Sequence, residues 1–255
     1  MMRKVAKMSG KSIFSQILAS ILVNAIYAMK NYPVMIINAL LAPLSILFII
    51  TFVSRGALVG VGIEGALMMS MISSGIGLQG DLSHLKNDFK LQDMVVTSQT
   101  KSSTYLAGMG ISEIVYSLPV IVILVILAAI YIHPSVLQAL AIIAVMALMF
   151  VFSIVLGFIL STYTSDVMQS WGFSGIISVL LSTIPPVYYP ITYIPMPFQY
   201  IAYLSPTTYG AEIVQSATGF LSISTLNLYV DWFVIVAVTV ILIVLAKKKA
   251  RWREV

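Results

Sequence analysis

The chain alternates long runs of apolar residues with short polar stretches, and these runs indicate its structural class. Six of them approach the roughly 20 residues that a helix needs to cross the hydrocarbon of a bilayer, namely residues 33–53, 60–80, 105–132, 136–161, 171–187 and 226–246. An earlier segment, residues 13–30, is interrupted by Gln16, Ser20 and Asn24, so we expect it to lie in the membrane interface. The pattern predicts an all-α polytopic membrane protein with six transmembrane helices and an N-terminal interfacial helix.

A stretch rich in proline and tyrosine separates the fifth and sixth runs. Residues 183–212 read TIPPVYYPITYIPMPFQYIAYLSPTTYGAE and contain no Lys or Arg. Proline removes a backbone donor and clashes with the preceding helical turn, so one continuous helix is excluded here. Tyrosine favours the membrane interface, and interrupted backbone at membrane depth must be covered by protein or line a water-filled cavity. We expect residues 188–222 to form a re-entrant hairpin, with an ordinary interfacial loop as the alternative.

Composition and charge agree with a membrane protein and predict its orientation. Hydrophobic residues make up 60% of the chain and charged residues 9%. If both ends face the cytoplasm, every Lys and Arg except Arg55 lies on the inner side, which satisfies the positive-inside rule. The Pro/Tyr stretch is then extracytoplasmic. The basic residues gather at membrane boundaries, so we do not expect a nucleic-acid partner.

Acidic residues inside apolar runs are candidate functional groups, because a charge in hydrocarbon is costly. We expect Glu64 to form a structural ion pair with Arg55 and Glu113 to form one with Lys101. A transport role for either acid is the alternative. Asp231 begins the last run, where we expect it to be solvated.

Small and soft side chains on the second run suggest close packing. Gly65, Ser73 and Gly77 would let neighbouring helices approach closely, and the methionines at 68, 69 and 71 offer an adaptable surface that is typical of a core.

Other site chemistries find little support. Residues 10–12 (GKS) match the end of a phosphate-binding loop, but the first glycine of that motif is replaced by Val5. His84 and His133 fall on opposite sides of the predicted membrane, so we expect no metal site, and the chain has no cysteine. We expect no catalytic residue and no cofactor bound by this chain.

The polar segment between the second and third runs, residues 81–104, is similar in its order of residues to a cytoplasmic segment of a known family of membrane proteins. In LKNDFKLQDMVVTSQTKSSTYLAG, acidic residues precede a leucine and a hydrophobic pair, followed by a turn and a glycine that enters the third run; these places are held by Asp88, Leu91, Asp93, Val95, Val96, Thr97 and Gly108. Ser98 and Gln99 stand where a proline usually follows Thr97, and no clear glycine precedes Leu91. These departures leave the limits of the segment open.

The Pro/Tyr stretch carries the second set of matching residues. A proline-containing start, an Ile-Pro step and an "n-P-l-t-y" element before an acidic residue are held by Pro190, Ile194, Pro195, Leu204, Ser205, Pro206, Thr207, Thr208, Tyr209 and Glu212. With the order of its helices, the chain resembles the permease subunit of type-2 ABC transporters, which are exporters of the type V transmembrane fold. The resemblance covers nearly the whole of residues 1–255, as one transmembrane domain.

The resemblance implies partners and roles that the residues alone do not. It implies a separate ATP-binding subunit that holds ATP and Mg²⁺, a second permease copy, equal or related, and a multi-pass location in the cell membrane of a prokaryote. Coupling to the ATPase is expected at Asp88, Lys90, Leu91, Asp93, Met94 and Val95, and an outer gate at Tyr188, Tyr189, Pro190, Pro195, Tyr200, Pro206 and Glu212. A six-helix channel, a secondary carrier and a membrane anchor for a partner complex are the competing functions.

Overall fold

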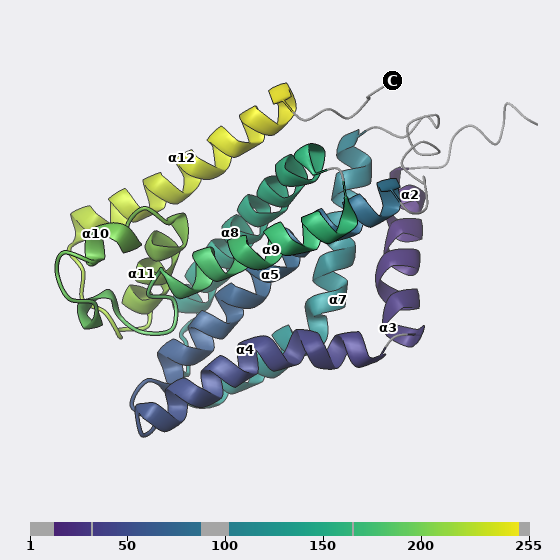
Figure 1. The fold of residues 1–255 in the computed structure, drawn as a ribbon. Helices are drawn as coiled ribbons and strands as arrows, with labels where there is room; N and C mark the ends of the chain where they lie inside the picture. The colour runs from purple at the N-terminus through teal and green to yellow at the C-terminus, as the bar shows by residue number, and fades with distance from the viewer. Residues whose placement is uncertain (1–12, 32, 88–101, 165, 250–255) are drawn as a thin grey trace, which may run out of the picture.

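The computed structural model describes residues 13–31, 33–87, 102–164 and 166–249, and over these ranges the chain folds into helices joined by turns and loops, without strands. Figure 1 shows a bundle with a smaller, irregular element at one end. The elements are α2 (Ile13–Ile21), the π-helix η2 (Leu22–Tyr27), α3 (Ala28–Asn31), α4 (Pro33–Val53), α5 (Val59–Asn87), α7 (Ser102–Tyr131), α8 (Val136–Tyr163), α9 (Val167–Thr183), the 3-10 helix η3 (Ile191–Tyr193), α10 (Gln199–Ala202), α11 (Pro206–Ala217) and α12 (Thr225–Lys249).

The predicted apolar runs fall within these helices, with one clear shift. The fifth run, predicted at residues 171–187, is helical from Val167 to Thr183. The helix starts earlier because the Asp166 side chain caps it by accepting a hydrogen bond from the Met168 amide. It ends before Pro185 and Pro186, where the chain cannot continue as a helix.

The helices that are long and apolar enough to cross a membrane are not the same set as the six predicted runs. Among the described residues, the segments long and apolar enough to cross are 13–31, 59–83, 107–131, 136–163 and 225–248, whereas α4 and α9 contain shorter apolar stretches, 39–53 and 167–182. The chain is therefore a multi-pass membrane protein by its helices, and the count of six crossings stays a prediction.

The segment α2–η2–α3 packs on α7 and lies across the direction of α9 (Figure 1). Asn24 on η2 donates to the Ser20 hydroxyl and to the Met109 sulfur, both at 3.1 Å. The segment α2–η2–α3 also leaves large apolar residues such as Phe14 and Val23 exposed. The length and composition of the segment would allow it to cross a membrane, so its interfacial location stays a prediction.

Helix α5 is the centre of the bundle, since α4, α7, α8, α9 and α11 all pack against it. Close approach to α8 depends on glycine: a Cβ at Gly75 would lie 2.1 Å from the Ser153 hydroxyl, and one at Gly157 would lie 2.8 Å from the Gly75 carbonyl oxygen. The prediction that small residues of the second run permit close packing holds for Gly65 but not for Gly77, which faces open space.

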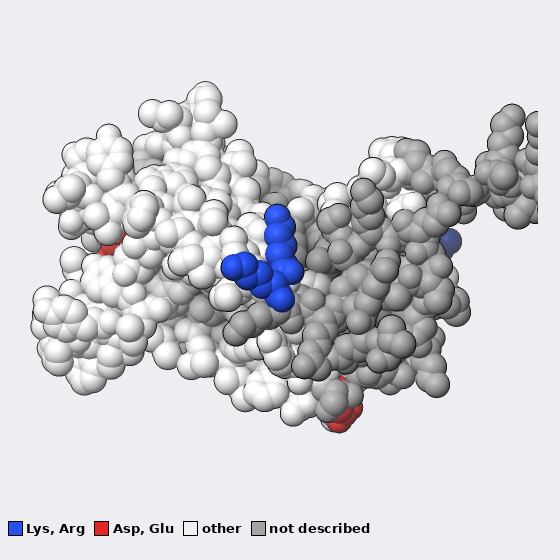
Figure 2. Space-filling view, turned by 90° about the horizontal axis from the view of Figure 1, so that it is seen from above, with Lys and Arg blue, Asp and Glu red and all other residues white. Residues whose placement is uncertain are grey.

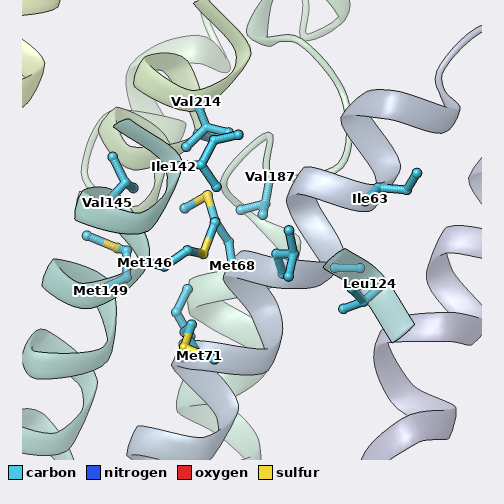
Figure 3. Packing of buried hydrophobic residues seen from close by; sticks show 14 of the residues in the cluster. Ile63, Met68, Met71, Leu124, Ile142, Val145, Met146, Met149, Val187 and Val214 are labelled. Carbon is cyan, nitrogen blue, oxygen red and sulfur yellow. The ribbon is translucent and has the colours of Figure 1, made fainter. Parts of the chain in front are cut away.

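The main hydrophobic core lies where α5, α8 and α11 meet (Figure 3). Met68 and Met71 of α5 lie in one buried cluster with Met146 and Met149 of α8 and Val214 of α11. Flexible thioether side chains fill irregular gaps between crossing helices. Met68 and Met71 are thus core residues, as their pattern indicated, and the core joins the long helices to the irregular end of the molecule.

Candidate functional site: the Pro/Tyr cap

Residues 185–217, here called the Pro/Tyr cap, form the irregular element at one end of the bundle (Figure 1). As expected from its prolines, the segment is broken into the short helices η3, α10 and α11. Pro190 precedes η3 in an extended conformation, and Pro206 occupies the first turn of α11, where its missing amide costs no helical hydrogen bond. The prolines therefore set where each turn begins.

The cap has a buried side and an exposed side, and the predicted gate residues are divided between them. Tyr188 is 4% exposed, and Pro190 and Glu212 are also buried. Tyr200 is 66% exposed, and Pro195 is exposed as well. Tyr189 and Pro206 are half-buried. The predicted gate residues therefore do not line one common surface in this structure.

Side-chain hydrogen bonds tie the buried side of the cap to the bundle and to itself. The Thr207 hydroxyl donates to the Leu181 carbonyl of α9 at 2.8 Å. From α11, the Gln215 amide donates to the Pro186 carbonyl at 3.1 Å and to the Tyr189 carbonyl at 3.4 Å. Because Pro186 and Tyr189 flank the first turn of the cap, Gln215 holds that turn against α11.

Glycine lets the first turn of the cap sit directly on α5. A Cβ built at Gly65 would lie 2.6 Å from the Val187 carbonyl oxygen and 2.8 Å from the Tyr188 ring. Any larger residue would have to displace backbone. The cap is thus in van der Waals contact with the central helix. A movement of α5 would therefore displace the cap.

Glu212 lies beneath two tyrosines of the cap. The Tyr203 hydroxyl donates to the Glu212 carboxylate at 2.8 Å, and the Tyr209 hydroxyl donates to the Tyr203 carbonyl at 3.0 Å. Burial raises the pKa of the Glu212 carboxyl, and the hydrogen bond from Tyr203 only partly opposes that shift. The carboxyl of Asp231 on α12 faces the same region.

Asp231 corrects a sequence-based expectation. We expected it to be solvated at the start of the last run, but it is 3% exposed, and one of its carboxyl oxygens has no hydrogen-bond partner. The cap contributes to this difference, since its helix α11 packs against α12. Sequence position alone gives no sign of such cover.

The predicted ion pair between Arg55 and Glu64 is not formed. Arg55 is exposed in the turn after α4, with a φ of 52°, whereas Glu64 is 1% exposed, and neither of its carboxyl oxygens has a hydrogen-bond partner. The Thr218 hydroxyl lies close to this carboxyl but already donates to the Val214 and Gln215 carbonyls. The helical register turns Glu64 toward α11 instead of toward the turn.

The predicted ion pair between Glu113 and Lys101 stays a prediction, and the structure shows another neighbour of Glu113. Lys101 lies outside the described residues, and the Glu113 carboxyl is within hydrogen-bonding reach of Asp81 on α5. Two carboxyl groups can share a hydrogen bond only when one of them carries a proton. The pair joins α5 to α7 near the ends that flank residues 88–101.

The predicted coupling residues, Asp88, Lys90, Leu91, Asp93, Met94 and Val95, also lie outside the described residues. What precedes them is described: α5 continues as a helix to Asn87, well beyond the predicted end of its run at residue 80. Within the described ranges, no group of three or more His, Asp or Glu side chains could hold a metal ion.

Sequence reasoning missed the residues that fasten the cap. Gln215 and Thr207 are fully buried, and each bonds to a carbonyl distant in sequence. The sequence signal was weak, because the buried residues of α11 mix polar side chains with apolar ones and nothing in the sequence singles out Gln215 or Thr207.

Comparison with known proteins identifies a family over most of the chain. A family model described as ABC-2 type transporter matches residues 15–218, from the interfacial segment to the end of the cap. No curated protein matches the chain.

Proposed function

The chain belongs to the ABC-2 type transporter family, and on that basis we propose that it is the permease subunit of an ATP-driven exporter. In this proposal it moves an amphipathic, lipid-like or drug-like substrate out across a prokaryotic cell membrane. Energy comes from a separate ATP-binding subunit that carries ATP and Mg²⁺.

The observation that best supports this proposal is the contact of the Pro/Tyr cap with the central helix. The cap rests on Gly65 of α5 through Val187 and Tyr188. Thr207 fastens the cap to α9, and Gln215 holds the first turn of the cap against α11. At its far end α5 leads into the segment that we expect to meet the ATPase. A rigid helix that joins the two ends can carry a movement from the ATPase to the cap.

A second permease copy would complete the route, and α9 offers a surface for it. Helix α9 leaves Trp171, Ile176 and Val179 exposed, and a Cβ at Gly172 or Gly175 would meet nothing within 4 Å. Small residues beside apolar ones are typical of helix–helix contacts in membranes. We propose that the α9 helices of two permeases face each other and that the route runs between them.

The substrate class follows from the walls that such a route would have. The exposed side of α9 carries apolar residues, and the cap presents Tyr193, Tyr200 and Phe198 to its surroundings. An inorganic ion would need polar groups to replace its hydration shell. An amphipathic substrate fits these walls better, and this also distinguishes the exporter from an ion channel.

The ATP-binding subunit is proposed to dock on residues 84–97. Leu91, Met94 and Val95 would be its apolar anchors, with Asp88, Lys90 and Asp93 at the rim. Burying one such apolar side chain contributes about 1.5 to 3 kcal/mol. The loss of a single anchor should therefore weaken the complex measurably.

Coexpression with the candidate ATP-binding subunit tests the proposal. The purified permease alone should hydrolyse no ATP, and the complex should hydrolyse ATP and transport an amphipathic dye into inverted vesicles. Leu91→Asp should abolish copurification, whereas Leu137→Asp, the same change at an exposed leucine of α8, should not. Normal assembly and transport by Leu91→Asp would refute the docking site. ATP hydrolysis by the isolated chain would refute the claim that a separate subunit hydrolyses ATP.

Thiol labelling tests the cap. The chain has no cysteine, so Tyr200→Cys should react with a membrane-impermeant reagent from outside, and the buried position of Tyr188→Cys should react slowly. Trapping the complex with nucleotide should change the reactivity of Tyr189→Cys. Labelling of Tyr200→Cys from the cytoplasm alone would overturn the orientation, and reactivity indifferent to nucleotide would show that the cap is not a gate.

A further inference from the structure

A long apolar groove opens between α7 and α8. Its volume is about 850 Å³, and α5 forms its floor through Leu67 and Met71. Helices α7 and α8 each pack on α5 but make little contact with each other. The groove exists because two consecutive helices rest on a third without closing against one another.

The walls of the groove are almost entirely aliphatic and aromatic. Ile111 and Ile114 of α7 face Ile143, Phe150 and Ile154 of α8 across it. Ile143 is 62% exposed, so the groove is open along its side. In a bilayer, a groove of this kind faces acyl chains rather than water.

One end of the groove is charged. Among the described residues that line the groove, Lys247 near the end of α12 is charged, and none of them is Asp or Glu. In Figure 2 most of the described residues on this face are uncharged, and a group of basic side chains lies near its middle. An apolar groove that ends at an ammonium group complements a ligand with an apolar tail and an anionic head.

The groove is long enough for an acyl chain. Its lining on α7 runs from Ala107 to Val125, which at 1.5 Å per residue is about 27 Å. The hydrocarbon of a bilayer is about 30 Å thick and one leaflet is about half of that, so an acyl chain that starts at the Lys247 end fits within the groove. Lys side chains at helix ends also extend toward the headgroup region.

We propose that the groove between α7 and α8 binds an anionic phospholipid, with one acyl chain against α5 and the phosphate on Lys247. The lipid is a resident of the permease and is distinct from the transported substrate, whose proposed route lies at α9. If both chain ends face the cytoplasm, as expected from the basic residues, Lys247 and the lipid headgroup lie at the inner leaflet. The rest of the proposal does not depend on that orientation.

Native mass spectrometry of the full chain, released from nanodiscs of equal phosphatidylglycerol and phosphatidylcholine, tests this site. The wild type should retain phosphatidylglycerol in preference to phosphatidylcholine. Lys247→Gln should weaken that retention at least about tenfold, since it removes a charge-assisted hydrogen bond. Lys248→Gln, at the neighbouring exposed residue that does not line the groove, should change it by no more than about twofold.

A second pair of variants tests the acyl-chain part of the site. Ala147→Trp places a large ring in the groove, and Ala144→Trp places one on an exposed part of α8 outside it. Ala147→Trp should abolish lipid retention and Ala144→Trp should preserve it, with helical content measured for both. If Ala147→Trp fails to fold, Ile143→Trp, at an exposed lining residue, replaces it.

Each remaining result contradicts the proposal in a defined way. Equal retention of the two lipids would refute the anionic headgroup, and equal retention by the two Trp variants would refute the groove. Competition by glycerol phosphate as strong as by lysophosphatidylglycerol would indicate a phosphate site without a chain pocket. Crosslinks between copies through the groove would indicate a protein partner instead. None of these measurements requires ATP, so their failure is separate from failure of the exporter proposal.

Discussion

Replacing Gly65 with alanine should loosen the contact between the central helix and the Pro/Tyr cap. The added Cβ would lie 2.6 Å from the Val187 carbonyl oxygen and 3.0 Å from the Tyr188 Cα, whereas ordinary contact begins at 3.4 Å. Both neighbours are backbone atoms, so no rotamer change relieves the clash. The cap or α5 must move.

The expected size of the effect follows from two opposing terms. Overpacking of a closely packed site costs about 1 to 3 kcal/mol, and Gly to Ala inside a helix contributes about 1 kcal/mol in the opposite direction. Gly77→Ala on the same helix meets nothing within 4 Å, so it gains the helical term alone. The two variants should therefore differ in free energy of unfolding by about 1 to 3 kcal/mol.

Thermal unfolding of both purified variants in the same detergent measures this difference. Gly65→Ala should have the lower Tm, and Gly77→Ala should match or exceed the wild type. In a Tyr189→Cys background, Gly65→Ala should also raise the thiol reactivity of the cap, and Gly77→Ala should leave it unchanged. A Gly65→Ala variant as stable as Gly77→Ala, with unaltered reactivity, would refute the contact.

Two further predictions concern the polar groups of the cap. Gln215→Leu leaves the Pro186 and Tyr189 carbonyls without a donor and should cost about 1 to 3 kcal/mol; a Tm equal to the wild type would contradict this. Glu212→Gln should change the pH dependence of stability. Because the folded pKa of Glu212 is raised above its ordinary value of 4.5, its stabilising contribution is complete below pH 4.5 and is lost as pH rises through the raised pKa. Tm measured against pH should therefore show the Gln variant gaining on the wild type from pH 4.5 to 8, and parallel curves would show that Glu212 does not titrate in this way.

The broken backbone of the cap illustrates what local sequence can and cannot predict. The prolines between 185 and 206 lie too close together for one long helix, and the structure has only the short helices η3 and α10 between them. Pro43 and Pro119, by contrast, lie inside α4 and α7, because an isolated proline in a membrane helix is tolerated where neighbouring groups satisfy the freed carbonyl. The spacing of prolines, rather than their presence, was the reliable signal.

The candidate site was predictable as a segment but not residue by residue. Tyr188 and Tyr200 have the same side chain in the same stretch, yet one is buried against Gly65 and the other is exposed. Burial depends on which residues of α5 face the cap, and no local pattern records that. Gln215 was missed for the same reason, since its acceptors lie in the segment between α9 and η3, which is distant from Gln215 in the sequence.

The sequence by itself determined the helical membrane class and the place of the cap, because both depend on transfer of apolar residues from water and on local backbone chemistry. The family followed from the resemblance of the inner segment, the Pro/Tyr stretch and the order of the helices. Only the tertiary structure decided that α5 is central, that Glu64 turns away from Arg55, and that α7 and α8 leave a groove between them. These features arise from which helix faces meet. A meeting of two faces joins residues far apart in the chain, and its geometry depends on the shapes of both surfaces at once.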